Sequence, residues 1–191
     1  SAFMLFIGMA YPVHAFNPRF AFVYASGDRR PRSGTATGFD SINDNINFGG
    51  GQNSYFFGEK IQLGNTTLLR GNSLYPSLRG GNATAQFENP GSIILNLGLD
   101  VALTQKAILE ANYNFVSFAD TAVLEARQGV SNIGHNLGSE LNMGVTYRPL
   151  LNENIILNFG GAVMFPGQGI KDLFGKDSTV YKVLARATFT Y

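Results

Sequence analysis

Residues 180–191 (VYKVLARATFTY) alternate between two kinds of side chain along their whole length. The apolar side is formed by Tyr181, Val183, Ala185, Ala187, Phe189 and Tyr191, and the mostly polar side by Lys182, Leu184, Arg186, Thr188 and Thr190. A period of two residues is typical of a β-strand with one apolar face. Two structures fit this segment: a strand of a transmembrane barrel, or the edge strand of a soluble sandwich.

The composition narrows the class of protein. The chain has 191 residues, a net charge of +1, no cysteine and two histidines. This length favours a single domain over residues 1–191, and the charge gives no broad basic surface for nucleic acid. Without cysteine the chain has no disulfide, no thiolate metal site and no covalent haem attachment, and we expect no cofactor. No apolar run reaches the roughly 18 residues of a membrane-spanning helix.

The same alternation recurs along the chain. Strands are expected at residues 2–13, 19–26, 92–104, 107–115, 140–148, 155–165 and 180–191. From residue 92 onward, odd-numbered strand residues form the apolar face and even-numbered ones the opposite face. Short turns are expected at residues 14–18, 105–106 and 149–154, and long connections at 27–90, 120–136 and 166–179. The longest connection contains strand-like pieces, such as residues 54–63, that could form a hairpin.

This pattern predicts an all-β fold, an antiparallel up-and-down transmembrane β-barrel. Strands of about ten to fourteen residues suit a tilted membrane crossing, and such barrels alternate short periplasmic turns with longer extracellular loops. Residues 27–90 are therefore expected to form a long extracellular loop. A strand count of seven, or nine with a hidden hairpin, is odd, which indicates the C-terminal part of a larger barrel. If residues 1–18 are not a strand, a complete barrel of six or eight strands is the alternative.

Several stretches resemble one protein family. They are residues 24–34 (YASGDRRPRSG), 39–45 (FDSINDN), 89–118 (NPGSIILNLGLDVALTQKAILEANYNFVSF) and 147–174 (YRPLLNENIILNFGGAVMFPGQGIKDLF). Together they resemble the C-terminal half of the alginate-export-like family of outer-membrane porins. The resemblance implies a monomeric barrel of roughly 16–18 strands with a polar lumen, in the outer membrane of a Gram-negative bacterium. It also implies contact with lipid and lipopolysaccharide, and recognition of the last strand, ending in Tyr191, by the barrel-assembly machinery.

Charged residues on the non-apolar face are the candidate pore-lining residues. They are the acids Asp100, Glu110 and Glu140 and the bases Arg148, Lys182 and Arg186, with Arg19 as a further base. Charges in a pore set its selectivity by focusing the electrostatic potential. The balance of signs is closer to a general porin than to an anion-selective channel, and so departs from the export of an anionic polysaccharide.

Three arginines, Arg29, Arg30 and Arg32, cluster where the second strand reaches the expected outer mouth. Guanidinium groups bind carboxylate and phosphate, so this cluster could attract anions to the pore. The alternative is that these arginines pair with loop aspartates such as Asp28, or with lipopolysaccharide phosphates. Two more arginines of the long connection, Arg70 and Arg79, could fold inward as a constriction.

An enzyme is not expected. His14 belongs to a short turn and His135 to a long connection, so they cannot share one catalytic site. The sequence favours a channel for polar or anionic solutes, with polysaccharide export as one form of it. The alternative function is a structural sheath around a partner, such as a periplasmic protein or a multihaem cytochrome, because the first strand is apolar on both faces.

Overall fold

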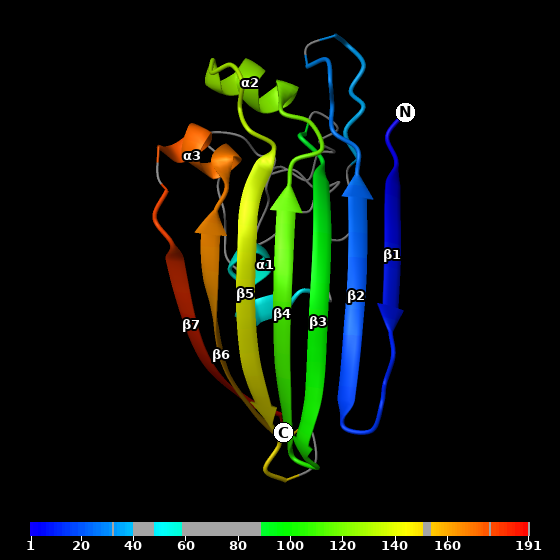
Figure 1. Ribbon diagram of the computed structural model, residues 1–191, viewed down its shortest axis with the longest axis vertical. Helices are drawn as coiled ribbons and strands as arrows, with labels where there is room; N and C mark the ends of the chain where they lie inside the picture. The colour runs from blue at the N-terminus through cyan, green and yellow to red at the C-terminus, as the bar shows by residue number, and fades with distance from the viewer. Residues whose placement is uncertain (32, 40–47, 59–88, 151–153, 176, 191) are drawn as a thin grey trace.

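The computed structural model describes residues 1–31, 33–39, 48–58, 89–150, 154–175 and 177–190. Its main feature is one antiparallel sheet in which seven strands lie side by side in chain order (Figure 1). The strands are β1 (Met4–Ala10), β2 (Phe16–Ala25), β3 (Ser92–Thr104), β4 (Ala107–Ser117), β5 (Asn136–Tyr147), β6 (Ile155–Pro166) and β7 (Val180–Phe189). The expected all-β, up-and-down arrangement is confirmed.

Short and long connections lie at opposite ends of the sheet, as the sequence predicts (Figure 1). The first hairpin closes with Val13 paired to Phe16 and with His14 in the left-handed region at φ 55°. β2 therefore begins at Phe16, three residues before the predicted strand. At the other end, the long connections carry two helices, α2 (Ala122–Gln128) and α3 (Gln168–Phe174).

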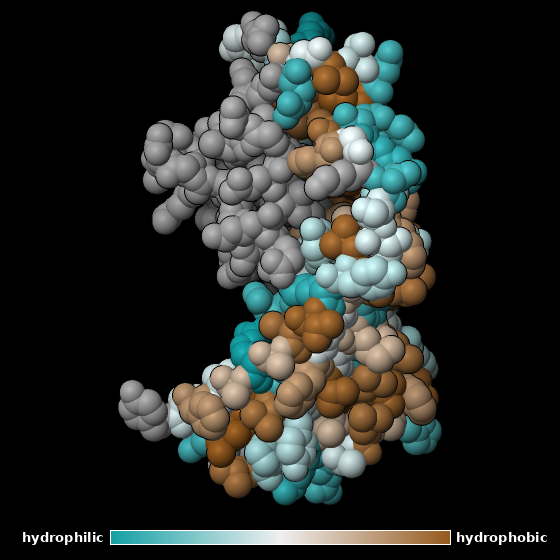
Figure 2. All heavy atoms as spheres, turned by 90° about the vertical axis from the view of Figure 1, so that its left-hand side faces the viewer, coloured by the Kyte–Doolittle hydropathy of each residue, from teal (hydrophilic) through white to brown (hydrophobic). Residues whose placement is uncertain are grey.

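The sheet has two chemically different faces. Outward-pointing Leu97, Leu141 and Phe159 are 50%, 54% and 54% exposed, whereas inward-pointing Asn96 and Asn142 are 1% and 5% exposed. The strand pairing aligns residues of one face in rows, such as Phe20, Leu97, Tyr113, Leu141, Val163 and Tyr181. Figure 2 shows apolar side chains gathered on the side of β5 to β7, mainly toward the short turns. The predicted alternation is therefore confirmed.

The inward face changes character along the strands. Near the long connections it is apolar, and Val23, Ile94 and Val116 pack there in register. Side chains from the connections complete this core, together with Leu137 of β5 and Met164 of β6. The connection residues are Phe56, Phe57, Phe118, Val123, Leu124, Ile133 and Ile170. Further toward the short turns the inward face is polar. The core thus packs the connections against one end of the sheet and leaves the polar part beyond it.

Three local predictions were wrong. Within the expected strand piece at residues 54–63, the described part forms a short helix, α1 (Tyr55–Gly58), preceded by a 3₁₀ turn, η1 (Gly51–Asn53). The other two errors are α2 and α3, which lie in stretches expected to be loops. Each has only seven residues, too few for a clear helical period, and each ends at a left-handed glycine, Gly129 or Gly175.

Both edges of the sheet lack a second neighbour. Among the described residues, β1 pairs only with β2, and β7 only with β6. The apolar side chains of β1 are correspondingly exposed on both faces, with Phe6 at 53% and Ile7 at 45%. None of the described helices is long and apolar enough to cross a membrane.

The backbone conformation just before β3 should require a glycine at position 91. Its φ is +60°, and an added Cβ would lie 2.3 Å from the carbonyl oxygen of Ala25. Gly91→Ala should therefore lower the free energy of unfolding by about 3 kcal/mol or more, because backbone atoms must move apart. Gly129→Ala is the control, since its φ is +67° but its Cβ would meet nothing within 4 Å. It should cost only about 1 kcal/mol. Equal losses in denaturant unfolding would contradict this account.

Candidate functional site

Asparagine side chains form a connected network on the polar part of the inward face. Asn96 on β3 donates to Asn114 on β4 at 2.8 Å, and Asn112 donates to Asn142 on β5 at 3.2 Å. The strand register places the two members of each pair directly opposite one another. Their side-chain amides therefore meet within the regular sheet. Buried amides are costly unless hydrogen-bonded, and the network supplies partners for most of them.

The network ends in Glu140, whose side chain is fully buried. One carboxylate oxygen, Oε1, accepts hydrogen bonds from the amides of Asn142 at 2.6 Å and Asn114 at 3.0 Å. The other oxygen, Oε2, accepts the backbone N–H groups of Tyr55 at 2.6 Å and Phe56 at 2.9 Å. Hydrogen bonds to an ionised group are roughly twice as strong as neutral ones. Glu140 thus joins the sheet to a segment more than eighty residues away in sequence.

That segment, residues 48–57, is called the inward-folded segment. Besides Glu140, the amides of Asn114 and Asn142 each donate to the carbonyl oxygen of Gly49 at 2.8 Å. Lys182 on β7 donates to the carbonyl oxygens of Gln52 at 2.7 Å and Ser54 at 3.1 Å. The segment therefore spans the concave side of the sheet from β4 to β7. This part of the long connection packs against the inward face of the sheet. The extracellular placement of residues 27–90 stays a prediction.

Glycines make room for the inward-folded segment. Asn53 lies over Gly144 on β5 and Gly160 on β6, where an added Cβ would be 2.1 and 2.3 Å from its side chain. Gly50, at φ +91°, has the side chain of Asn142 at 1.9 Å from the position of a Cβ. Gly49 and Gly50 are thus closely packed, whereas a Cβ added at Gly51 would meet nothing within 4 Å.

Charged residues lie on the inward face beyond the inward-folded segment. Arg19 on β2 forms an ion pair with Asp100 on β3, and Asn17 donates to the same carboxylate at 3.1 Å. Glu110 stands opposite Asp100 in the register, and Arg186 stands opposite Asn158. Arg148 lies close enough to Glu110 for their charges to interact.

A polar pocket of about 280 Å³ separates the inward-folded segment from these charges. Its lining consists of Arg19, Phe48, Gly50, Gly51, Gln52, Asn53, Glu110, Asn158 and Arg186. A larger hollow of about 730 Å³ lies mainly over the outward face, where small Ala111 and Gly161 stand between larger apolar residues. Because that hollow is apolar and shallow, we place the chemistry of the site in the smaller polar pocket.

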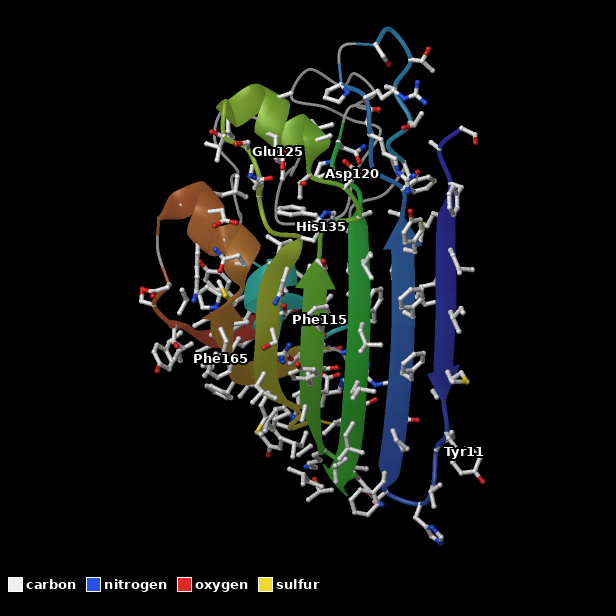
Figure 3. The ribbon with its side chains drawn as sticks, turned by 45° about the horizontal axis from the view of Figure 1, so that its top comes forward. Tyr11, Phe115, Asp120, Glu125, His135 and Phe165 are labelled. Atoms are coloured by element: carbon white, nitrogen blue, oxygen red, sulfur yellow. The ribbon has the colours of Figure 1, made fainter. Side chains whose placement is uncertain are left out.

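Arg29 and Arg30 do not line this pocket. The Arg29 side chain is 78% exposed, and its Nε atom lies 3.6 Å from the carboxylate of Asp120. Its ion-pair partner is therefore Asp120 and not Asp28, which the sequence had suggested as a partner. Asp28 is buried and accepts hydrogen bonds from the Arg30 backbone and the Thr37 hydroxyl, both at 3.2 Å. Asp120 and His135 lie at the end of the sheet that carries the long connections (Figure 3). Arg32, Arg70, Arg79 and Tyr191 lie outside the described residues.

The predicted lumen residues share the inward side but have different roles. Asp100, Glu110 and Arg186 surround or adjoin the polar pocket. Glu140 and Lys182, also predicted to line the pore, hydrogen-bond the inward-folded segment. The hydrogen-bonded network of Asn96, Asn112, Asn114 and Asn142 was not predicted from the sequence. Asparagines at even-numbered, inward-facing positions of three neighbouring strands were the available signal.

Comparison with known proteins adds no family assignment. No protein-family model matches the chain, and no curated protein matches its sequence. The resemblance to the alginate-export-like family therefore stays a prediction. Among the described residues, no group of three or more histidines, aspartates or glutamates is arranged to hold a metal ion.

Glu140→Gln tests whether this carboxylate holds the inward-folded segment. The glutamine amide would point an NH₂ group at donors that now share a carboxylate, leaving buried N–H groups without an acceptor. We expect a loss of about 1–3 kcal/mol in stability and faster hydrogen exchange at the amides of Tyr55 and Phe56. Asp177→Asn, at an exposed position, is the matched control. Unchanged protection of both amides would show that Glu140 is not the anchor.

Proposed function

We propose that this chain forms neighbouring strands of a closed transmembrane barrel in the bacterial outer membrane, which acts as a channel for small polar solutes. The observation that carries the proposal is the two-faced sheet. One face exposes apolar side chains along all its central strands, and the other carries a hydrogen-bonded polar network and a polar pocket. Outer-membrane barrels have this distribution, with lipid outside and a polar lumen inside.

The outward face supports a lipid environment. Leu97, Leu141 and Met143 are each at least half exposed, and Val183 is 91% exposed. They are neighbours across β3 to β7, so the apolar surface is continuous. Contiguous apolar patches beyond a few hundred Å² are rare on soluble monomers and mark contact with a membrane or a partner. Lipid would cover this face without requiring a specific protein partner.

The open edges support a larger barrel. A barrel leaves no strand edge unpaired, because each strand bonds to two neighbours. β1 and β7 would each gain their second neighbour from further strands, bringing the total to the roughly 16–18 that the family resemblance implies. In that setting Arg29 and Arg30 would lie at the outer mouth, within reach of lipopolysaccharide phosphates.

The inward side supports passage of small solutes more than of a polymer. The inward-folded segment crosses the concave face from β4 to β7 and narrows any path along it. Beside it the charges are mixed, with Arg19 already paired to Asp100. Such a constriction favours compact polar molecules over a polyanionic chain, which needs a wide and positive path.

A sheath around a partner protein is the alternative function. Its motivation is the apolar inward side of β1. Phe6 of β1 packs against Phe48 of the inward-folded segment, with ring centroids 5.9 Å apart. The chain itself thus supplies a contact for that surface, which weakens the reason to invoke a partner.

Planar-bilayer recordings test the channel directly. The purified full-length protein should insert and give discrete conductance steps. Only weak anion or cation selectivity is expected, because the charges on the inward face are balanced. A protein that inserts but carries no current at any voltage would contradict the channel and favour the sheath.

Two neighbouring arginine substitutions on β6 test the orientation of the faces. Phe159 points outward and is 54% exposed, whereas Asn158 points into the polar pocket. Phe159→Arg should destabilise the membrane-inserted barrel by about 2–4 kcal/mol if it lies near the bilayer middle. Asn158→Arg should leave insertion intact and shift selectivity toward anions. The reverse pattern in unfolding and conductance measurements would mean that the faces are assigned the wrong way round.

A further inference from the structure

The polar pocket next to the inward-folded segment has charges of opposite sign at its two sides. Glu110 projects from β4, and Arg186 from β7. Among the described residues neither side chain has an ion pair or hydrogen bond, in contrast to Arg19, which is paired with Asp100. Arg148 and Arg19 influence Glu110 electrostatically but do not contact its carboxylate.

Small residues separate the two charges. In the register, the positions between Glu110 and β7 are Gly144 and Gly160, and Asn158 lies directly opposite Arg186. Because these glycines are covered by Asn53, the floor between the charges is flat and amide-lined. A ligand can therefore lie across the sheet and reach one charge with each end.

The lining also holds polar atoms without partners. The side-chain oxygens of Asn53 and Asn158 and the Nε–H group of Arg19 are buried and make no hydrogen bond in the part of the chain that the structure describes. Asn53 itself is only 4% exposed. Two acceptors and one donor complement a peptide group, which offers one N–H and one carbonyl oxygen. Buried polar atoms without partners are costly, so a ligand that satisfies them gains affinity.

We infer that this pocket binds small zwitterionic solutes of dipeptide size, with the ammonium end at Glu110 and the carboxylate end at Arg186. A pocket of about 280 Å³ admits such a molecule. Opposite charges at the two ends reject a solute with one charge only, because one pocket charge then stays unpaired. The inference rests on the proposed channel function, since it makes this pocket the selective point of the pore.

Four forms of alanyl-alanine, nearly equal in size, separate the contribution of the ammonium end from that of the carboxylate end. They are the free zwitterion, the N-acetylated anion, the C-amidated cation and the doubly blocked neutral form. In bilayers holding the full-length protein, the zwitterion should block the ion current at a concentration about threefold to fivefold lower than any of the others, as expected for partly exposed ion pairs. Equal block by all four, or strongest block by the anion, would overturn the inference while leaving the channel intact.

Two variants test which pocket charge binds the ammonium end of the dipeptide and which binds the carboxylate end. Glu110→Gln should remove the advantage of the zwitterion over the acetylated anion, and Arg186→Gln its advantage over the amidated cation. Asp177→Asn and Lys171→Gln change exposed charges outside the pocket and should leave both advantages unchanged. If one pocket variant fails to assemble, the other must still show its half of the pattern. Loss of both advantages in both variants would contradict the assigned orientation.

Calorimetric titration of the detergent-solubilised protein with the same dipeptides separates this inference from the channel. Preferential binding of the zwitterion in a protein that carries no current would sustain the pocket and contradict the channel. Conductance without any preference among the dipeptides in the titration would support the channel and contradict the zwitterion-binding pocket.

Discussion

The buried carboxylate of Glu140 is the contact on which the interior of this protein depends. It accepts two amide N–H groups from the sheet and two backbone N–H groups from the start of α1. An unpaired charge cannot remain in such a place, because desolvation would cost several kcal/mol. The inward-folded segment and the asparagine network are thus mutually dependent. Without the segment the carboxylate loses half of its donors, and without the carboxylate the first turn of α1 loses its acceptor.

Periodicity accounts for how much of the sheet could be predicted. The alternation of Leu97, Leu99 and Val101 with Gly98 and Asp100 specifies both a strand and its faces, because a shift of one residue would exchange every side chain. The Gln105-Lys106 turn then sets the register of β3 with β4. The interior of the long connection carries no such signal. Tyr55 and Phe56 look strand-like in isolation, and the helix they begin is specified by Glu140, far away in sequence.

The candidate site was predictable only in part for a related reason. Charge and even-numbered position placed Asp100, Glu110 and Arg186 on the inward face. Position in the alternation cannot say which of these charges form ion pairs. Arg19 and Asp100 pair because β2 and β3 are neighbours across a connection of more than sixty residues. Arg29 instead meets Asp120 from another connection. Alternation placed the asparagines on the inward face as well, but their network follows only from the register, which brings them to matched positions of adjacent strands.

The division of the inward face into an apolar and a polar part bears on how a channel could work. Near the long connections, Val23, Ile94 and Val116 are covered by side chains of the connections, so that end of the face is a packed core. A solute moving along this wall would meet water and charge on the side of the short turns and would have to pass around the packed region. The inward-folded segment lies at the boundary between the two parts, because its Phe56 belongs to the core and its Asn53 to the polar pocket. Selection at this boundary needs no moving part. The hydrogen bonds of Glu140 and Lys182 hold the segment in place. In the proposed channel, Glu110 and Arg186, which have no ion pair among the described residues, would then decide which solutes pass.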